Sequence, residues 1–292
     1  MQIKESFRSA SMTSIDTAHV EEIEALSHLA NHVTTNPSLM YQALSKYSAY
    51  EGINLFRSEK TSPNDSIYNV ATALFAKKIL PKISGELSIQ IDPRKSNSFE
   101  ESLQSAYDLI ETLQKMGTNT DKILLKVAST ESGFKLINHL QRKGIRCNAT
   151  CVMSLSQAQK AVDHGADMIA CYVARIKDWY DKNEYVLPYH PGIVLTEEIY
   201  SYLVQSSPST KLMAASFRTI EEIALIQPQI IVTVSPSLLR QSQKSSLSAT
   251  YSLPASIKEF DQQQATMLKE KLAESLQRFS NDTDLLESIL KK

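Results

Sequence analysis

The feature that most constrains this chain is a regular alternation between short apolar or β-branched runs and longer segments with helical periodicity. The short runs predict strands at residues 12–16, 32–36, 86–92, 122–127, 145–151, 167–173, 211–215 and 230–234. Helical patterns between them cover residues 20–29, 38–50, 67–80, 98–116, 132–142, 155–164, 196–204 and 219–226. This alternation within 292 residues favours parallel strands joined by right-handed crossovers, and hence a closed (β/α)8 TIM barrel of the α/β class.

The rest of the chain fits one domain spanning residues 1–292. Segments 51–66, 174–192 and 236–253 are polar or serine-rich and predict connections. Beyond residue 254, apolar side chains recur at helical spacing through Phe279, which predicts an additional C-terminal helix lying across the barrel.

Composition excludes several classes of function. The chain has 7 glycines, against about twenty at average usage, and it contains neither a GxGxxG turn nor a GxxxxGK[ST] phosphate loop. This also weakens the competing fold, a doubly wound open sheet that binds a nucleotide. A net charge of -1 argues against nucleic acid or an anionic membrane as the main partner. No run reaches the ~18 apolar residues of a membrane span.

Cysteine and histidine usage predicts a cytoplasmic protein without a metal. Cys147, Cys151 and Cys171 fall in or beside apolar runs, as buried thiols of a reducing compartment do. His28 and His32 have i,i+4 spacing, but that interval straddles a predicted helix end and lacks further ligands. We therefore expect neither a metal nor a cofactor.

Polar residues collect at the ends of seven of the eight predicted strands. The active site of such a barrel lies at the carboxyl ends of its strands, so these residues are expected to share one rim. They are Asp16, Thr17, Thr34, Thr35, Asn36, Gln90, Asp92, Lys126, Asn148, Thr150, Tyr172, Arg175, Ser216 and Arg218.

Lys126 is the sharpest single signal, because it interrupts the apolar run ILLKVA at residues 123–128. Strand periodicity puts Leu124 and Lys126 on one face, which points into the barrel if the other face meets the helices. A desolvated lysine favours its neutral amine and becomes a nucleophile toward a ketone or aldehyde. The alternatives are a lysine that reaches solvent or one that pairs structurally with Asp16 or Asp92.

The sequence resembles the transaldolase family over nearly its whole length. The matching strings are DTA at 16–18, TTNPSL at 34–39, the stretch 123–179 that begins ILLKVAST, MAASFR at 213–218 and EKLAESLQRF at 270–279. The resemblance implies that Lys126 forms a Schiff base with the ketose carbonyl. It implies that Asp16 is the general base, although Asp16 could instead cap the helix that follows. Asn36 and Asn148 would bind the hydroxyls of the three-carbon unit, supported by Thr35.

The resemblance also implies a phosphate site. Arg175 and Arg218, with Ser216, would hold the substrate phosphate through charge-assisted hydrogen bonds. The ordinary alternative is that the two arginines pair with nearby acids such as Asp178 or Glu221.

Gln90 and four residues within 170–175 depart from the usual transaldolase pattern. Gln90 stands where the family has Glu, and residues 170–175 read ACYVAR instead of SPFVGR. The usual Glu would shuttle protons through a water and Thr150, whereas Gln can hold the water but cannot accept its proton. Tyr172 could supply that proton transfer instead. The pair of Gln90 and Tyr172 resembles the fructose 6-phosphate aldolases of the same superfamily.

These residues predict a class I Schiff-base transaldolase of the pentose phosphate pathway. It would move a dihydroxyacetone unit between ketose and aldose phosphates, from fructose 6-phosphate to erythrose 4-phosphate. One alternative is a fructose 6-phosphate aldolase that releases free dihydroxyacetone, and another is a non-catalytic paralogue that binds sugar phosphates. The expected partners are sugar phosphates, and a homodimer is left open.

Overall fold

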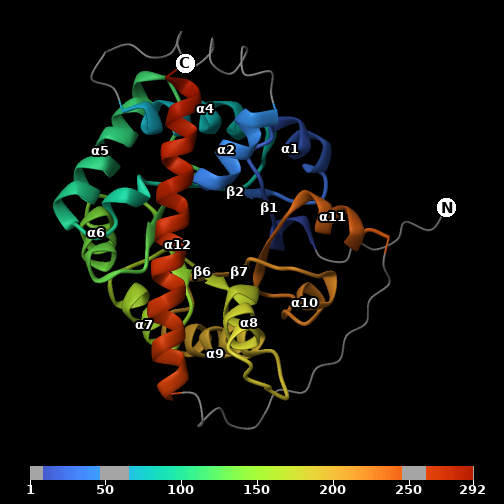
Figure 1. Ribbon diagram of the computed structural model, residues 1–292. Helices are drawn as coiled ribbons and strands as arrows, with labels where there is room; N and C mark the ends of the chain where they lie inside the picture. Colours follow the sequence, from blue (N-terminus) through green and yellow to red (C-terminus); the bar gives the residue numbers. More distant parts are fainter. Residues whose placement is uncertain (1–8, 47–65, 245–260, 292) are drawn as a thin grey trace.

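A closed parallel barrel forms the centre of the molecule. The computed structural model describes residues 9–46, 66–244 and 261–291. Within them, the strands are β1 (Thr13–Asp16), β2 (His32–Thr34), β3 (Leu87–Gln90), β4 (Ile123–Ala128), β5 (Cys147–Val152), β6 (Met168–Tyr172), β7 (Lys211–Ala215) and β8 (Ile231–Val234). They pair in chain order, and β8 pairs with β1 to close the ring (Figure 1). The predicted (β/α)8 barrel is confirmed, and each predicted strand overlaps an observed one.

Helices surround this ring. They are α1 (Val20–Leu26), α2 (Pro37–Lys46), α4 (Ile67–Ile79), α5 (Phe99–Lys115), α6 (Glu131–Gln141), α7 (Leu155–Asp163), α8 (Val173–Lys182), α9 (Pro191–Ser206), α10 (Ile220–Ala224), α11 (Pro236–Ser242) and α12 (Asp261–Leu290). The part of the chain that the structure describes also has three short 3-10 turns, η1 (Ala10–Met12), η2 (Leu80–Lys82) and η3 (Pro93–Lys95). Several helices begin at a serine or threonine whose hydroxyl accepts a hydrogen bond from the first turn, as the chemistry of N-caps favours. These caps are Ser66, Ser98, Thr130, Ser154, Thr219 and Ser235.

Two separate apolar layers lie on the two faces of the strands. The inner layer is a small cluster inside the barrel, made of Leu124, Met168, Met213 and Ile231 with Met12 packed against it. The outer layer lies between strands and helices and is far larger. A strand with both faces covered in this way reads as a continuous apolar run, which is why these strands were visible in the sequence.

Strand β4 has the face assignment that its periodicity predicts. Ile123, Leu125 and Val127 belong to the outer layer, whereas Leu124 belongs to the inner one. Lys126 is two residues further along and therefore shares the inward face with Leu124. This register places its amine above the inner apolar cluster, toward the carboxyl ends of the strands.

The prediction that residues 174–192 form a polar connection holds for residues 183–190 and is wrong for the rest. Helix α8 occupies Val173–Lys182, directly after β6, and α9 begins at Pro191, five residues before its predicted start. The many polar residues of α8 favour a loop in the sequence. Its buried side chains Ile176, Trp179 and Tyr180 nevertheless lie at helical spacing.

The serine-rich segment 236–253 also begins with a helix, α11, which the sequence reading missed. Ser235 caps it and Pro236 occupies its first turn, where a missing amide hydrogen costs nothing. Residues 245–260 lie outside the described part of the chain, as does the predicted connection 51–66 except for its last residue.

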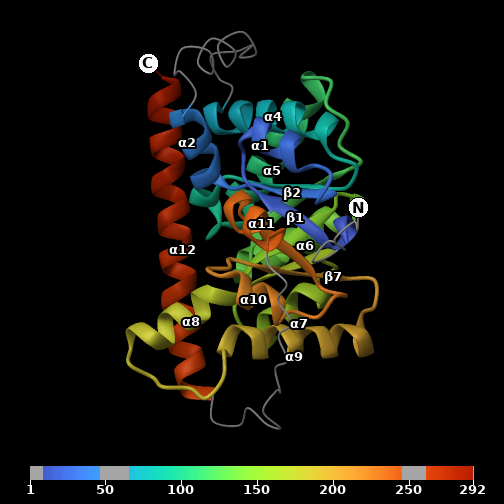
Figure 2. The same ribbon diagram turned by 90° about the vertical axis from the view of Figure 1, so that its right-hand side faces the viewer.

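Helix α12 lies across the carboxyl-end mouth of the barrel, as predicted. It packs on α2, η3 and α8, which directly follow β2, β3 and β6, and thus contacts nearly opposite sides of the ring. Figure 1 shows α12 in front of the strands, and Figure 2 shows it standing to one side of them. Arg94 ties the helix down through ion pairs with Asp284 and Glu287, at 2.9 and 2.7 Å.

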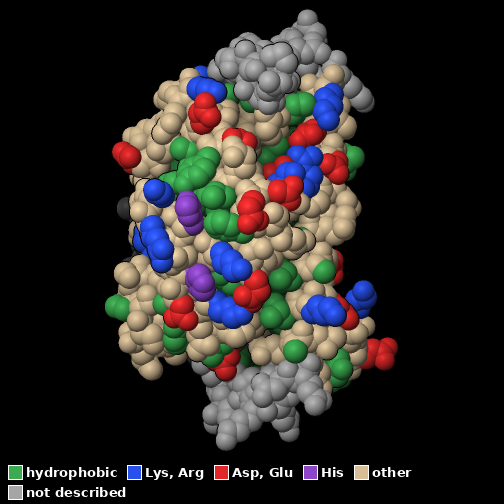
Figure 3. Space-filling view, turned by 90° about the vertical axis from the view of Figure 1, so that its left-hand side faces the viewer, with side chains coloured by type: hydrophobic (Ala, Val, Ile, Leu, Met, Phe, Trp, Pro, Cys, Tyr) green, Lys and Arg blue, Asp and Glu red, His purple; other side chains and the backbone are tan. Residues whose placement is uncertain are grey.

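The outer surface carries charges of both signs. Figure 3 shows Lys and Arg side chains interspersed with Asp and Glu side chains on one face of the molecule. The ion pairs Lys95–Glu101, Lys115–Glu111 and Lys160–Glu131 are of this kind. Every helix in the described ranges is too short or too polar to cross a bilayer.

Candidate active site

Lys126 occupies the middle of a lateral row of polar residues. The Cα register aligns Gln90 of β3 with Lys126 of β4, and Lys126 with Asn148 of β5. The Lys126 side chain is 4% exposed, and its Nζ donates to the backbone oxygen of Thr35 on the β2 side at 3.4 Å. The alternative that this lysine reaches solvent is therefore wrong.

The surroundings of Lys126 favour its neutral amine. Burial lowers the pKa of the Lys126 amine, because desolvation penalises its charged form. The nearby Asp16 carboxylate opposes this effect, and the Arg175 guanidinium adds to it. An amine with a lowered pKa is deprotonated at lower pH and can attack a carbonyl carbon.

Asp16 ends β1 and is held by a chain of hydroxyls. The Thr34 hydroxyl donates to Asp16 Oδ1 at 2.7 Å and lies 2.6 Å from the Thr233 hydroxyl of β8. Because the single Thr34 proton goes to Asp16, the Thr233 hydroxyl is the donor of the second bond. The alternative that Asp16 caps α1 is wrong, since His19 is the N-cap residue there and makes no side-chain cap.

The two asparagines have different roles in the fold. Asn36 Oδ1 accepts from the backbone nitrogen of Leu39 at 3.1 Å and so starts α2. Asn148 is fully buried, and its Nδ2 donates to Ser88 Oγ at 3.1 Å. Within the described ranges, Asn148 Oδ1 and the Thr35 hydroxyl are buried without a hydrogen-bond partner. Unpaired buried polar atoms inside a barrel are suited to a polar ligand.

The residues predicted to move protons lie on β3, β5 and β6. The Thr150 and Tyr172 hydroxyl oxygens are 3.2 Å apart, and both residues are buried. Burial raises the pKa of the Tyr172 phenol, as does nearby Cys151. Gln90 is 2% exposed, and its Oε1 has no hydrogen-bond partner among the described residues.

Arg175, Ser216 and Arg218 lie at the neighbouring ends of β6 and β7. The backbone oxygen of Ser216 accepts from Ala174 nitrogen at 3.2 Å, and Ser216 has a left-handed φ of 66°. Arg218 donates from Nη1 to Ser216 Oγ at 3.4 Å and pairs with Asp178 at 2.7 Å, as the structural alternative predicted. The structure thus brings the three predicted phosphate ligands to one side of the rim.

Known proteins resemble the chain over almost its whole length. The sequence model of the transaldolase/fructose-6-phosphate aldolase family matches residues 13–290. A protein of Mannheimia succiniciproducens named transaldolase is 31% identical, over 98% of this chain and 97% of its own. A transaldolase of a Marinomonas species is 33% identical over 94% of both chains, and transaldolase A of Pasteurella multocida is 30% identical over 98% and 97%. The chain belongs to the transaldolase/fructose-6-phosphate aldolase family.

Membership of this family supports an enzyme with a transaldolase-family function. The family name covers both a transferase, transaldolase, and an aldolase, fructose-6-phosphate aldolase. The residues near Lys126 are relevant to which of these two activities the protein has. The Gln90 and Tyr172 side chains, in which the sequence departs from the usual transaldolase pattern, are both buried in the barrel of this family member.

Sequence reasoning missed three residues that contact the predicted site. Thr233 completes the hydroxyl chain to Asp16, Ser88 binds Asn148, and Ser275 of α12 binds Arg175. Thr233 and Ser88 are inward-facing polar residues in apolar strands, which is the same signal that identified Lys126. Ser275 gave no local signal, because its partner is 100 residues away in the sequence.

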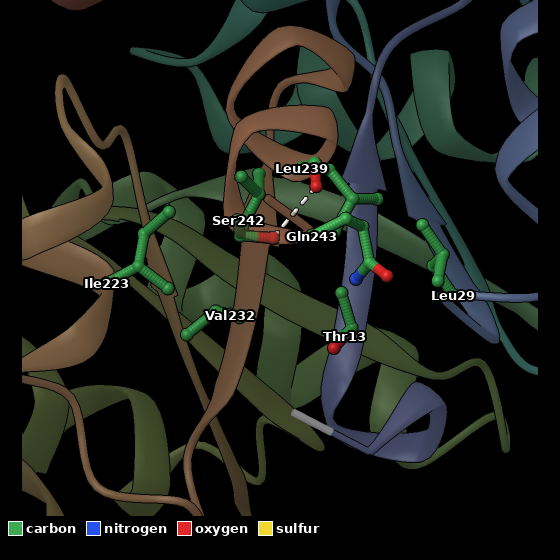
Figure 4. A pocket seen from close by; sticks show the side chains of 8 residues that line it. Thr13, Leu29, Ile223, Val232, Leu239, Ser242 and Gln243 are labelled. Atoms are coloured by element: carbon green, nitrogen blue, oxygen red, sulfur yellow. Dashed lines mark hydrogen bonds between the residues drawn. The ribbon is translucent and has the colours of Figure 1, made fainter. Parts of the chain in front are cut away.

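Two further features lie outside this set of residues. A cavity of about 10 Å³ lies between α11, β1 and β8 and is lined by Thr13, Val232 and Leu239 among others (Figure 4). It has room for about one water molecule and not for a sugar phosphate. Among the described residues, no group of three or more His, Cys, Asp and Glu side chains could hold a metal ion.

Proposed function

We propose that this family member is a Schiff-base transaldolase with Lys126 as its nucleophile. The observation that carries the proposal is a lysine amine buried inside the barrel, with a pKa lowered by burial and with Asp16 among its nearest charges. Sugar phosphates are the proposed substrates, with fructose 6-phosphate as donor and erythrose 4-phosphate as acceptor in the pentose phosphate pathway.

The proposed reaction proceeds through a covalent imine. The Lys126 amine adds to the ketose carbonyl carbon, and water leaves as the imine forms. Asp16 then accepts the proton of the C4 hydroxyl while the C3–C4 bond breaks. The electron pair of that bond moves into the protonated imine. Glyceraldehyde 3-phosphate leaves. The bound three-carbon enamine adds to the acceptor aldehyde, Asp16 returns the proton, and hydrolysis of the new imine releases sedoheptulose 7-phosphate.

Buried polar groups near Lys126 support recognition of the three-carbon unit. Its hydroxyls would be bound by Asn148 and Asn36, with Thr35 beside them. The unpaired Asn148 Oδ1 is an acceptor suited to a sugar hydroxyl. The phosphate of the substrate would lie against Arg175, Ser216 and Arg218. The planar guanidinium groups of the two arginines suit phosphate oxygens. Arg218 would exchange its pairing with Asp178 for the phosphate.

A second candidate function is an aldolase that releases free dihydroxyacetone. The contact of 3.2 Å between the Tyr172 and Thr150 hydroxyls favours it, together with Gln90 in place of a carboxylate. A phenol next to a threonine hydroxyl can protonate the three-carbon enamine and then, as the phenolate, accept a proton from the water molecule that hydrolyses the resulting imine. The two functions share every step up to cleavage of the C3–C4 bond. They differ in whether the three-carbon intermediate then reacts with an aldehyde or with water.

The decisive experiment traps the imine with borohydride in the presence of fructose 6-phosphate and locates the added mass. We expect an adduct on Lys126, which Lys126→Arg abolishes and Lys122→Arg, at an exposed neighbour, retains. Absence of the adduct would contradict both enzyme functions and leave a non-catalytic paralogue.

Product analysis then separates the transferase from the aldolase. Dihydroxyacetone is assayed with and without erythrose 4-phosphate. Formation of sedoheptulose 7-phosphate only when erythrose 4-phosphate is present identifies the transferase. Steady release of dihydroxyacetone without the acceptor identifies the aldolase.

We also propose that the protein works in the cytoplasm. All three cysteines are buried free thiols, which is typical of a reducing compartment. Localisation of the tagged protein by microscopy or fractionation tests this proposal.

A further inference from the structure

We propose that Ser275 of the terminal helix is a positioning residue for Arg175 and thereby sets the affinity for the substrate phosphate. The inference deepens the proposed function, because it rests on Arg175 as a phosphate ligand. It makes α12 a part of the active site, although the helix is far from the barrel strands in sequence.

The hydrogen bond between the two residues is short and partly buried. Arg175 Nη1 donates to Ser275 Oγ at 2.6 Å, and Ser275 is 0% exposed. The Ser275 hydroxyl itself donates to the backbone oxygen of Lys271 at 2.6 Å. Its proton is therefore directed along the helix, and its oxygen is left to accept from the guanidinium. A charged donor in such a short, partly buried bond is strongly restrained.

Two aromatic rings restrain the same guanidinium. Its central carbon lies 4.8 Å from the centre of the Tyr172 ring and 5.5 Å from that of Phe279. Both distances suit a cation–π contact. Ser275 and Phe279 are four residues apart and so lie on the same face of α12. One face of the terminal helix thus supplies both a hydrogen-bond acceptor and an aromatic wall to Arg175.

An arginine held in this way can still bind phosphate. The guanidinium has five N–H donors, and the bond to Ser275 uses one of them. Ser275 and a phosphate can therefore be bound together, with the serine fixing the plane in which the remaining donors point. Without Ser275, Arg175 would have to lose side-chain freedom each time it binds a phosphate, which weakens binding.

Helix α12 is anchored independently of Arg175. Trp179 Nε1 donates to Glu270 at 2.7 Å, Ser38 donates to Asp282, and Arg94 pairs with Asp284 and Glu287. These contacts lie on both sides of Ser275 along the helix. A Ser275→Ala substitution should therefore leave the helix in place and remove the contact with Arg175.

Ser280 provides a matched control on the same helix. Its hydroxyl donates to the backbone oxygen of Leu276 at 2.8 Å, as that of Ser275 does to Lys271. Ser280→Ala therefore removes the same kind of bond within the helix without touching Arg175. Circular dichroism and thermal unfolding of both variants check that the fold is retained.

The test compares borohydride trapping on Lys126 with fructose 6-phosphate and with fructose. For Ser275→Ala, we expect the half-saturating concentration of fructose 6-phosphate to rise about tenfold, as for loss of a hydrogen bond to a charged group. The value for fructose, which has no phosphate, should stay unchanged, and Ser280→Ala should change neither value.

The outcomes separate this inference from the proposed function. If the unaltered protein forms no adduct, the proposed function fails. If it forms the adduct but Ser275→Ala behaves like Ser280→Ala, binds fructose 6-phosphate more tightly, or loses affinity equally for both sugars, the positioning role of Ser275 is wrong.

Discussion

The Tyr172 hydroxyl oxygen lies 3.2 Å from the Thr150 hydroxyl oxygen, with both side chains buried at the carboxyl ends of β6 and β5. If this pair moves protons to and from the imine, Tyr172→Phe should lower kcat on the order of 10²-fold. The aromatic ring that contacts Arg175 remains, so KM should change little. Steady-state kinetics with fructose 6-phosphate measure both values.

Tyr107→Phe serves as the control for this substitution. Tyr107 is 36% exposed and its hydroxyl contacts His139 on the surface. Loss of this phenol should leave kcat unchanged. A Tyr172→Phe enzyme that turns over at nearly the normal rate would show that the phenol transfers no essential proton.

The hydroxyl chain from Thr233 through Thr34 to Asp16 predicts a selective defect in bond cleavage. Thr233→Val removes the donor to Thr34 while nearly keeping the side-chain shape. Asp16 should then be less well oriented, and cleavage of the C3–C4 bond should slow about tenfold. Imine formation, which uses Lys126, should be retained. Rapid-quench measurement of glyceraldehyde 3-phosphate, beside borohydride trapping, distinguishes the two steps, and slowing of both equally would contradict the prediction.

Gln90 predicts how the three-carbon intermediate is shared between water and aldehyde. Its Oε1 is buried without a partner among the described residues, so Gln90→Glu would place a titratable oxygen there. We expect the ratio of free dihydroxyacetone to transfer product to fall, because the site then approaches the usual transaldolase pattern. The ratio is measured by product assays at fixed erythrose 4-phosphate. An unchanged or increased ratio would refute this role.

The lowered pKa of Lys126 predicts a pH-dependent effect on stability. Between the folded-state pKa and the ordinary lysine value of about 10.4, the unfolded chain binds a proton that the folded chain does not, so stability rises with pH there. Below this window, the folded chain carries a buried ammonium. Lys126→Met should therefore raise the free energy of unfolding by about 1 to 2 kcal/mol near neutral pH.

That advantage of Lys126→Met should shrink as pH increases through the window. Urea denaturation at a series of pH values measures it. Lys122→Met, at an exposed residue, should stay within about 0.5 kcal/mol of the unaltered protein. A stabilisation that is independent of pH would mean that ordinary packing, and not desolvation of the amine, is responsible.

Most elements of the fold were predictable because each has its own periodicity. The run ILLKVA identified β4 and the direction of Lys126, since alternation along a strand is a local property. Helix α8 was not predicted because many of its residues are polar. Ile176, Trp179 and Tyr180 have helical spacing, but they form too short an apolar pattern to indicate a helix. Polar residues at strand ends were predicted to share a rim, and the barrel brings Lys126 to the same row as Gln90 and Asn148.

The sequence by itself determined the barrel, its order of strands and the inward lysine, because these follow from patterns repeated over a few residues. Only the tertiary structure decided which hydroxyls hold Asp16 and which residue holds Arg175. Thr34 and Thr233 are 199 residues apart, and Arg175 and Ser275 are 100 apart. Such bonds depend on closure of the barrel and on the position of α12 across its mouth, and no local periodicity encodes that distance. The barrel strands therefore place Lys126, the proposed nucleophile, and the terminal helix contacts Arg175, the residue proposed to bind the substrate phosphate.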